Sequence, residues 1–427
     1  MKGRPLLGIR FVGLAILLGL SQVPVARAAA PRLPHWIAVW GCSAAEPFPH
    51  VGDSPIPEAP RIQGTVRYRI PVARLGRQLQ LRLTNEAGTT PLVVGAVSVG
   101  VANVGLAVRP GTLVKVTFGN LPGIVIPAGA PVVSDPISHA FGSAADLIVS
   151  VYLPEPTVQA QGQSGILVAS LGGRDATLED NPPDLKLVAA RPMVSGVYVD
   201  TPQPAATVVT LGDSITDAAM STSQEVRGWP GQLALRLAKA AGKVRYGVSN
   251  QGIGGNRLLL DGIGANALAR FNRDVASQPG VSHVIVLEGI NDIGIGKGSF
   301  NDFHFEDGKF TSTGLPVSAA ELIAAYQQLI VRAQAAGLKI IGGTLVPFKG
   351  SFYYSEERER VRQDVNSWIR GSGAFDAVID FERAVRDKVD PGRMAAAYDS
   401  GDHLHPTDAG YAAMADAIDL KLFAGAR

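Results

Sequence analysis

The spacing of apolar residues changes character near the middle of the chain. In the first half, apolar and polar residues alternate, as where Val66, Tyr68 and Ile70 are separated by two arginines. The runs with this period cover residues 66–70, 79–84, 114–118 and 147–153. Alternation of this kind places one side of a strand on a core and the other toward solvent. Turn residues separate the runs and no convincing helical stretch interrupts them, so residues 31–199 are predicted to form an all-β sandwich or jelly-roll domain.

A short connection follows the predicted β-domain. Residues 200–206 contain two prolines and several small residues, which is typical of a stiff, exposed linker. We therefore expect a second domain over residues 207–427.

Strand and helix patterns alternate in this second part. Short apolar runs suited to buried strands cover residues 208–211, 244–248, 284–287, 338–346 and 377–381. Helical spacing covers residues 230–241, 318–336 and 409–423, and Ser318 and Glu321 have capping-box spacing. Such alternation predicts an α/β fold with a parallel sheet between helices, in which ligands bind at the carboxyl ends of the strands.

The first residues have the features of an export signal. Lys2, Arg4 and Arg10 precede an apolar run over residues 11–20, and an A-x-A site follows at residues 26–28. The run is too short for a confident membrane span. Residues 1–28 are therefore predicted to be a signal peptide, which implies a secreted or periplasmic protein with no stable membrane span after cleavage.

The composition of the chain argues against nucleic-acid binding and against a disulfide-stabilised fold. The 427 residues include 39 Lys and Arg against 37 Asp and Glu, a balance that does not indicate binding to nucleic acid. The one cysteine, Cys42, rules out an intramolecular disulfide framework and is expected to pack as a small apolar side chain. Oligomeric state cannot be read from the sequence.

Four clusters of candidate chemistry follow the predicted strands. Ser214 stands in a tight turn after the first strand, and a glycine-rich stretch over residues 250–257 follows the second. Asn291 follows the third strand, where its amide could donate to an oxyanion or merely cap a turn. Asp402 and His405 lie three residues apart before the last helix, a spacing that lets the carboxylate reach the imidazole. Together the clusters supply a nucleophile, a base, a group that orients the base, and oxyanion donors.

Metal binding is the main alternative for the last cluster. Asp402, His403, His405 and Asp408 could surround a metal ion, but no further group of His, Cys or carboxylate residues supports such a site. We therefore expect neither a metal nor an organic cofactor.

The four clusters, taken in order, resemble the sequence blocks of the SGNH hydrolases, a subset of the GDSL esterases and lipases. The resemblance implies that Ser214 is the nucleophile, with Asp402 and His405 completing a catalytic triad. It implies further that Ser214, Gly255 and Asn291 form the oxyanion hole. The implied fold is the flavodoxin-like parallel sheet of this family. The one departure is Ile215, where the family name expects Leu.

The resemblance extends to a secreted two-domain subgroup of bacteria and fungi. Residues 254–258, 287–294 and 399–411 look like this subgroup, and residues 81–92 and 134–136 resemble its N-terminal β-domain. The resemblance therefore covers nearly all of the chain after the signal peptide.

Three further residues are candidates for substrate binding. Arg257 could meet an anionic substrate, although a surface or ion-paired arginine is the more common outcome. Phe303 and Phe305 belong to an apparent insertion, residues 294–315, which suits either a lid or a self-packed surface loop.

These features together predict a secreted serine ester hydrolase acting on carboxylic esters. The β-domain favours O-acyl groups of carbohydrates as substrates, and a lipase, lysophospholipase or small-ester hydrolase is the alternative. The competing class is a non-catalytic carbohydrate-binding protein.

Overall fold

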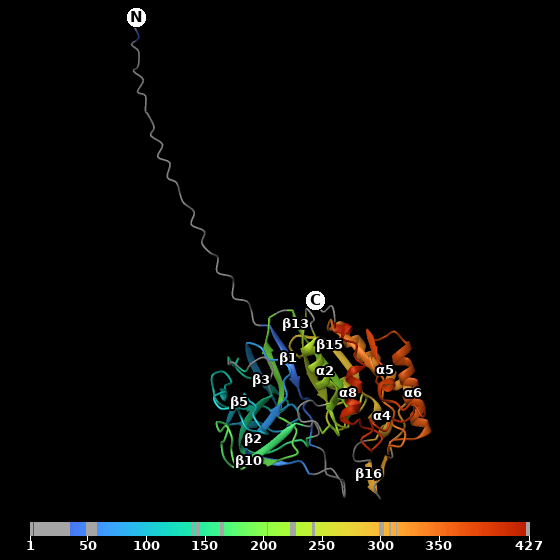
Figure 1. The fold of residues 1–427 in the computed structure, drawn as a ribbon, viewed down its shortest axis with the longest axis horizontal. Coiled ribbons are helices and arrows are strands. Elements are labelled where there is room, and N and C mark those ends of the chain that lie inside the picture. The colour runs from blue at the N-terminus through green and yellow to red at the C-terminus, as the bar shows by residue number, and fades with distance from the viewer. Residues whose placement is uncertain are drawn as a thin grey trace. The chain divides into compact units, whose positions relative to one another are not determined.

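The computed structural model describes residues 3, 35–47, 58–138, 141, 146–162, 166–202, 204–222, 228–240, 244–298, 303–306, 309–312 and 314–423. From His35 onward the chain forms one compact unit (Figure 1). Apart from Gly3, the predicted signal peptide lies outside the described residues. No helix in the described part of the chain is long and apolar enough to cross a membrane.

The first part of the compact unit consists of antiparallel sheets. Four strands pair in the order β1-β12-β3-β8 and six in the order β11-β10-β2-β9-β5-β6, while β4 pairs with β7. The strands are β1 (Trp36–Gly41), β2 (Arg61–Ile70), β3 (Gln78–Thr84), β4 (Leu92–Val94), β5 (Ala96–Val101), β6 (Val114–Val116), β7 (Ile124–Ile126), β8 (Pro131–Val133), β9 (Leu147–Val158), β10 (Leu167–Gly172), β11 (Lys186–Leu187) and β12 (Val194–Asp200). Leu81 of β3 and Val149 of β9 belong to one buried cluster, so the two larger sheets share a core. The predicted all-β class of this region is confirmed.

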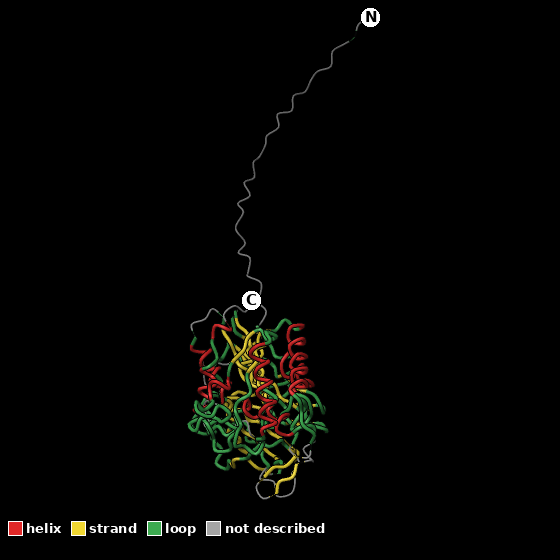
Figure 2. The backbone as a smooth tube through the Cα atoms, turned by 90° about the vertical axis from the view of Figure 1, so that its right-hand side faces the viewer, coloured by secondary structure: helices red, strands yellow, loops and turns green. Residues whose placement is uncertain are grey.

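The second part is a parallel sheet covered by helices (Figure 2). Its strands are β13 (Ala205–Gly212), β14 (Arg245–Gly252), β15 (Val281–Leu287), β18 (Lys339–Gly343) and β19 (Ala377–Ile379), in the order β14-β13-β15-β18-β19. Its α-helices are α1 (Ser214–Asp217), α2 (Gly228–Lys239), α3 (Ala267–Phe271), α4 (Ile290–Ile295), α5 (Ala319–Ala335), α6 (Glu356–Gly371), α7 (Phe381–Val385) and α8 (Asp408–Asp416). Numbered along the chain, the strand order is 2-1-3-4-5, which confirms the predicted flavodoxin-like fold.

The helices differ from the sequence prediction in number and in extent. The expected closing helix over 409–423 is wrong in extent, because α8 ends at Asp416 and a separate 3₁₀ turn covers Leu420–Phe423. The Asp419 side chain accepts from Lys421 N–H at 2.9 Å and starts this new turn. Helix α6 was not predicted, because its first turns carry mostly charged residues. The capping box at Ser318 and Glu321 is present.

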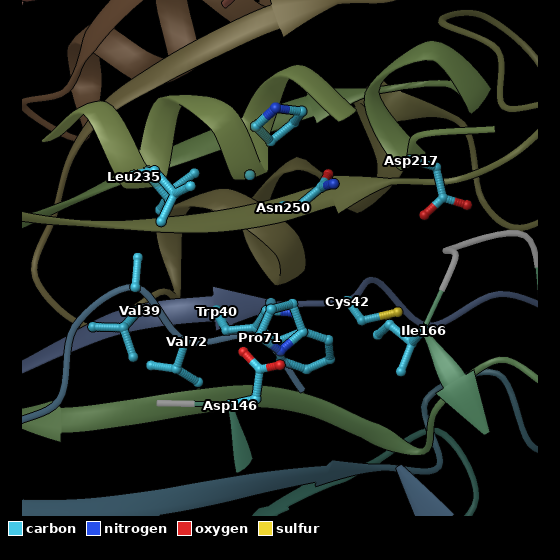
Figure 3. Close-up of a pocket in the computed structure, with 16 residues that line it drawn as sticks. Val39, Trp40, Cys42, Pro71, Val72, Asp146, Ile166, Asp217, Leu235 and Asn250 are labelled. Atoms are coloured by element: carbon cyan, nitrogen blue, oxygen red, sulfur yellow. The ribbon is translucent and has the colours of Figure 1, made fainter. Parts of the chain in front are cut away.

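The two parts pack directly against each other. Strand β1 crosses β14, where a side chain at Gly247 would collide with the Ala38 carbonyl and one at Gly41 with Ser249. These glycines therefore permit close approach of the two backbones. A cavity of about 110 Å³ lies at this junction, between Trp40 on β1 and Asn250 on β14 (Figure 3).

Candidate active site

Ser214 stands where β13 turns into α1. The Asp213 side chain caps the short helix by accepting from Ile215 N–H at 2.9 Å. Strand β14 ends beside this turn, where a side chain at Gly252 would collide with the backbone of Asp217. The glycine thus lets the ends of two neighbouring strands meet around Ser214, which is 7 % exposed.

The loop before α8 brings a histidine and a carboxylate to this serine. Ser214 Oγ lies 2.8 Å from His405 Nε2, and His405 Nδ1 lies 2.6 Å from Asp402 Oδ2. Although 191 residues separate Ser214 from His405 along the chain, the three side chains form one continuous hydrogen-bonded row. In this arrangement the carboxylate holds the tautomer in which Nε2 can accept the serine proton.

Asp402 is held as an anion by its surroundings. Its Oδ1 accepts from the N–H groups of Leu404 and His405 at 2.9 and 2.8 Å, and from Ser400 Oγ at 3.0 Å. Partial burial raises the pKa of Asp402, but these hydrogen bonds and the His405 ring outweigh it and leave the pKa below its usual range. An anionic Asp402 can orient His405 and stabilise its protonated form.

Gly255 lies in a tight turn after β14. Asn256 N–H donates to the Ile253 carbonyl at 3.0 Å, and Gly255, the third residue of this turn, has φ +73°. This left-handed conformation favours glycine and is typical of a type II turn. Ile253 N–H donates to the Gly212 carbonyl at 3.0 Å, so the turn lies next to the end of β13.

Asn291 reaches the same turn from α4. Its Nδ2 donates to the Asn256 carbonyl at 2.8 Å, and its Oδ1 accepts from Tyr353 O–H at 2.9 Å. The side chain is almost fully buried. The structure therefore brings Asn291 beside the Gly255 turn, as required of two donors to one oxyanion.

Asp292, the next residue, has a structural task. Its two carboxylate oxygens accept from Leu258 N–H at 2.7 Å and Leu259 N–H at 2.9 Å. Burial raises the pKa of Asp292 to about 6 despite these hydrogen bonds. Asp292 thereby ties α4 to the segment that follows the Gly255 turn.

Sequence reasoning missed Arg270, a buried arginine on α3. It donates to the Gly212 carbonyl at 2.9 Å, the Gln251 carbonyl at 2.6 Å and Asn256 Oδ1 at 2.9 Å, and it pairs with Asp274 at 2.9 Å. It thus joins the ends of β13 and β14 to the turn that carries Gly255. The i,i+4 spacing of Arg270 and Asp274 is the one signal in the sequence, and an exposed helix pair shows the same spacing.

Two buried carboxyl groups lie near Ser214. Gly212 pairs with Leu287 in register, so Asp213 and Glu288 follow at neighbouring strand ends. Both are fully buried, and among the described residues neither Asp213 Oδ2 nor Glu288 Oε1 has a hydrogen-bond partner. Burial is the main cause that raises the pKa of each carboxyl above its ordinary value; the charge of Asp292 adds to the rise at Asp213, and the charge of Asp213 adds to the rise at Glu288.

His403 stands in the same loop as Asp402 and His405 but does not join their row of hydrogen bonds. Its Nδ1 lies 2.5 Å from Asp399 Oδ2, and its backbone has φ +60°. A non-glycine residue in this conformation is strained by about 1–3 kcal/mol. The Asp399 carboxylate, which also accepts from His403 N–H at 3.0 Å, helps hold it there.

The three weaker substrate-binding candidates have different placements. Arg257 is 1 % exposed and donates to the carbonyls of Gly296 and Gly298 at 3.1 and 2.6 Å, so its guanidinium is engaged inside the protein. Phe303 and Phe305 lie on β16 (Phe303–Glu306), which pairs with β17 (Lys309–Ser312), but their side chains lie outside the described part. At the base of this ribbon, Lys297 N–H donates to the Leu315 carbonyl at 2.8 Å.

The residues weighed as metal ligands have other partners. Asp408 accepts from Ser221 Oγ at 2.5 Å, while Asp402 bonds to His405. No group of three or more His, Cys, Asp or Glu side chains within the described ranges could hold a metal ion. Burial raises the pKa of the Cys42 thiol to about 11, so this cysteine is a weak nucleophile.

Comparison with known proteins supports a hydrolase domain. The sequence model of the GDSL-like Lipase/Acylhydrolase family matches residues 210–413. No curated protein matches the chain. The stretch matched by the family contains the turn at Ser214, the oxyanion candidates Gly255 and Asn291, and the loop with Asp402 and His405.

Solved structures with some likeness include three hydrolases. An acetylxylan esterase from Geobacillus stearothermophilus is 21 % identical, with a TM-score of 0.37, over 50 % of this chain and 91 % of that one. A GDSL-like lipase from Bacteroides thetaiotaomicron is 18 % identical, with a TM-score of 0.33, over 49 % and 84 %. An alpha/beta hydrolase from the metagenome of Lake Arreo is 22 % identical, with a TM-score of 0.36, over 50 % and 92 %. Likenesses this weak identify no substrate. By the family match, residues 210–413 form a GDSL-like lipase/acylhydrolase domain, and the predicted class of enzyme, an ester hydrolase, is confirmed.

Proposed function

We propose that this protein hydrolyses carboxylic esters through a Ser214–His405–Asp402 triad and an acyl-serine intermediate. The observation that carries the proposal is the continuous row of hydrogen bonds, 2.8 Å from Ser214 Oγ to His405 Nε2 and 2.6 Å from His405 Nδ1 to Asp402. Nucleophile, base and orienting carboxylate in contact are the parts that acyl transfer requires.

Acylation begins when Ser214 Oγ bonds to the ester carbonyl carbon as His405 Nε2 takes the hydroxyl proton. The tetrahedral intermediate then collapses, the bond to the alcohol oxygen breaks, and His405 returns its proton to the leaving alcohol. Water then attacks the acyl carbon while His405 takes a proton from it; the bond to Ser214 Oγ breaks, His405 returns the proton to Ser214, and the carboxylic acid leaves. Asp402 stays anionic and stabilises the imidazolium in both halves.

The oxyanion is proposed to lie between the N–H groups of Ser214 and Gly255 and the Asn291 amide. The Asn291 contact with the Asn256 carbonyl, 2.8 Å, supports this assignment because it holds the amide beside the Gly255 turn. Loss of one such donor typically lowers turnover by about 10²–10³-fold.

The deciding experiment compares Ser214→Ala with the wild type on a short-chain aryl ester. Ser372→Ala, at the exposed C-terminal end of α6, is the matched control. We expect Ser214→Ala to lose hydrolysis and labelling by a phosphonate probe while Ser372→Ala keeps both. Hydrolysis by Ser214→Ala at the wild-type rate would sink the proposal, and a wild type that neither hydrolyses esters nor takes the probe would favour the non-catalytic binding protein.

For the substrate, we propose O-acyl groups of carbohydrates, with lipid and small acyl esters as the alternative. A β-domain packed directly on the hydrolase domain, with Arg191 bonded to Asp217 at 2.9 Å three residues from Ser214, suits a polymeric substrate. Acetylated polysaccharides and acyl esters of increasing chain length should be compared by kcat/KM. Preference for long acyl chains on simple alcohols would reverse the assignment.

We propose further that residues 1–28 are a cleaved signal peptide and that the enzyme works outside the cytoplasm. The charged start, apolar run and A-x-A site support this. N-terminal sequencing of the exported protein should begin at Ala29. Recovery of uncleaved chain from the cytoplasm alone would overturn it.

A further inference from the structure

Tyr353, which the triad mechanism does not use, touches an oxyanion candidate. Its O–H donates to Asn291 Oδ1 at 2.9 Å, and both side chains are buried. We propose that Tyr353 is a positioning residue of the ester hydrolase, which holds the Asn291 amide with its NH₂ group toward the oxyanion. The inference rests on the proposed function, since it gives Tyr353 a task in that reaction.

The two ends of the Asn291 amide have opposite partners. Oδ1 faces a donor, Tyr353, while Nδ2 faces an acceptor, the Asn256 carbonyl at 2.8 Å. Rotating the amide by half a turn would set its oxygen against the Asn256 carbonyl, and two acceptors would then repel each other. The contacts therefore select one orientation.

This orientation leaves one amide hydrogen for the substrate. Asn291 Nδ2 carries two hydrogens, and the Asn256 carbonyl takes one of them. No other hydrogen bond of this NH₂ group is formed within the described residues. Donors already aimed before the reaction stabilise developing charge at no further cost in reorganisation.

Tyr353 is itself fixed. Its ring packs against Gly294 of α4, where any side chain would collide with it. Arg358 donates to the Tyr353 carbonyl at 3.0 Å, and Ser351 Oγ accepts from Tyr353 N–H at 3.3 Å. Burial raises the pKa of Tyr353, so the phenol keeps its proton and remains a donor. The loop after β18 thus supplies a rigid support for the oxyanion side of the site.

The test is a double-mutant cycle of Tyr353→Phe and Asn291→Ala. Phenylalanine keeps the ring that packs on Gly294 and removes the donor. A hydrogen bond of this kind is worth about 0.5–1.5 kcal/mol, so kcat should fall about two- to twelvefold with KM little changed. In the Asn291→Ala background, Tyr353→Phe should change kcat by less than about twofold, because its effect passes through Asn291.

Tyr246→Phe is the matched control. Tyr246 is also buried and donates to a carbonyl, that of Phe423 at 2.6 Å; it stands at the start of β14, the end opposite the nucleophile turn. The Tyr246→Phe variant should be less stable than the wild type but should keep the wild-type kcat. All assays are run well below the lowest melting temperature of the variants. Binding of a boronic acid that mimics the tetrahedral intermediate is measured in parallel. Of these two variants, only Tyr353→Phe should bind the boronic acid more weakly than the wild type.

Two outcomes would overturn the inference while leaving the proposed function intact. One is a Tyr353→Phe enzyme with wild-type kcat and boronate affinity. The other is an equal loss of kcat with and without Asn291. A wild type that lacks esterase activity, or a fully active Ser214→Ala variant, would instead overturn the proposed function.

Discussion

Arg270 Nη2 lies 2.9 Å from the carbonyl oxygen of Gly212, two residues before Ser214. The same guanidinium reaches Gln251 and Asn256, so one buried side chain sets the spacing of the nucleophile turn and the Gly255 turn. A residue outside the proposed triad therefore joins the two turns that carry Ser214 and Gly255.

Replacing Arg270 by Ala should destabilise the protein strongly. Breaking a buried pair by removing one partner typically costs about 3–5 kcal/mol, because Asp274 and the freed carbonyls remain buried. Urea unfolding measures the loss. Lys339→Ala, which breaks the exposed pair with Asp376, is the control and should cost no more than about 1 kcal/mol. Similar costs for the two variants would contradict a central role for Arg270.

Asp402→Asn should separate chemistry from folding. The amide can no longer impose the His405 tautomer, so kcat should fall by about 10⁴-fold while the melting temperature changes little. Steady-state kinetics on an aryl ester and a thermal melt give the two readings. A loss of less than about tenfold would mean that Asp402 is not the orienting carboxylate.

The free energy of unfolding should depend on pH through the buried carboxyl groups of Asp213 and Glu288. The pKa values of Asp213 and Glu288 are raised in the folded state, so folding favours their protonated forms. Their contribution is therefore complete below the unfolded pKa of about 4 and is lost as pH rises through the higher folded values. The pKa of Asp292, about 6 when folded, acts in the same direction.

The free energy of unfolding is measured by urea titration at a series of pH values from acid to mildly alkaline. The part of this free energy that these carboxyl groups contribute should fall as pH rises. Glu288→Gln removes one titrating group at nearly constant volume and should flatten the curve. Identical pH curves for the variant and the wild type would show that Glu288 titrates alike in folded and unfolded chains.

Two glycines should respond oppositely to alanine. At Gly252 a side chain would collide with the backbone of Asp217, so Gly252→Ala should destabilise by about 1–3 kcal/mol and impair turnover. At Gly371, the last residue of α6, a side chain meets nothing within 4 Å, and alanine should stabilise by about 0.5–1 kcal/mol. Denaturant unfolding and aryl ester kinetics of both variants test this prediction. Stability changes of the same sign in the two variants would contradict it.

The β16–β17 ribbon should influence substrate choice more than stability. Its base is closed by the Lys297–Leu315 hydrogen bond, so residues 299–313 can be replaced by a short glycine linker. We expect the ratio of kcat/KM for long and short esters to change with little shift in melting temperature. Unchanged ratios across the ester series would show that the ribbon does not meet substrate.

Sequence alone was sufficient for the features that depend on local pattern. Period-two runs indicated the β sheets, and strand–helix alternation indicated the parallel sheet. The pairing of Asp402 with His405 could also be predicted from the sequence, because a spacing of three residues on one turn brings a carboxylate to an imidazole.

Only the tertiary structure decided what supports the site. Arg270 and Tyr353 act on partners distant in the chain, and neither stands in a recognisable motif. Arg257, a candidate for binding substrate, is buried on backbone carbonyls instead. The physical reason is that local spacing sets which side chains share a face, whereas burial and hydrogen-bond partners depend on segments that meet only when the strand ends assemble.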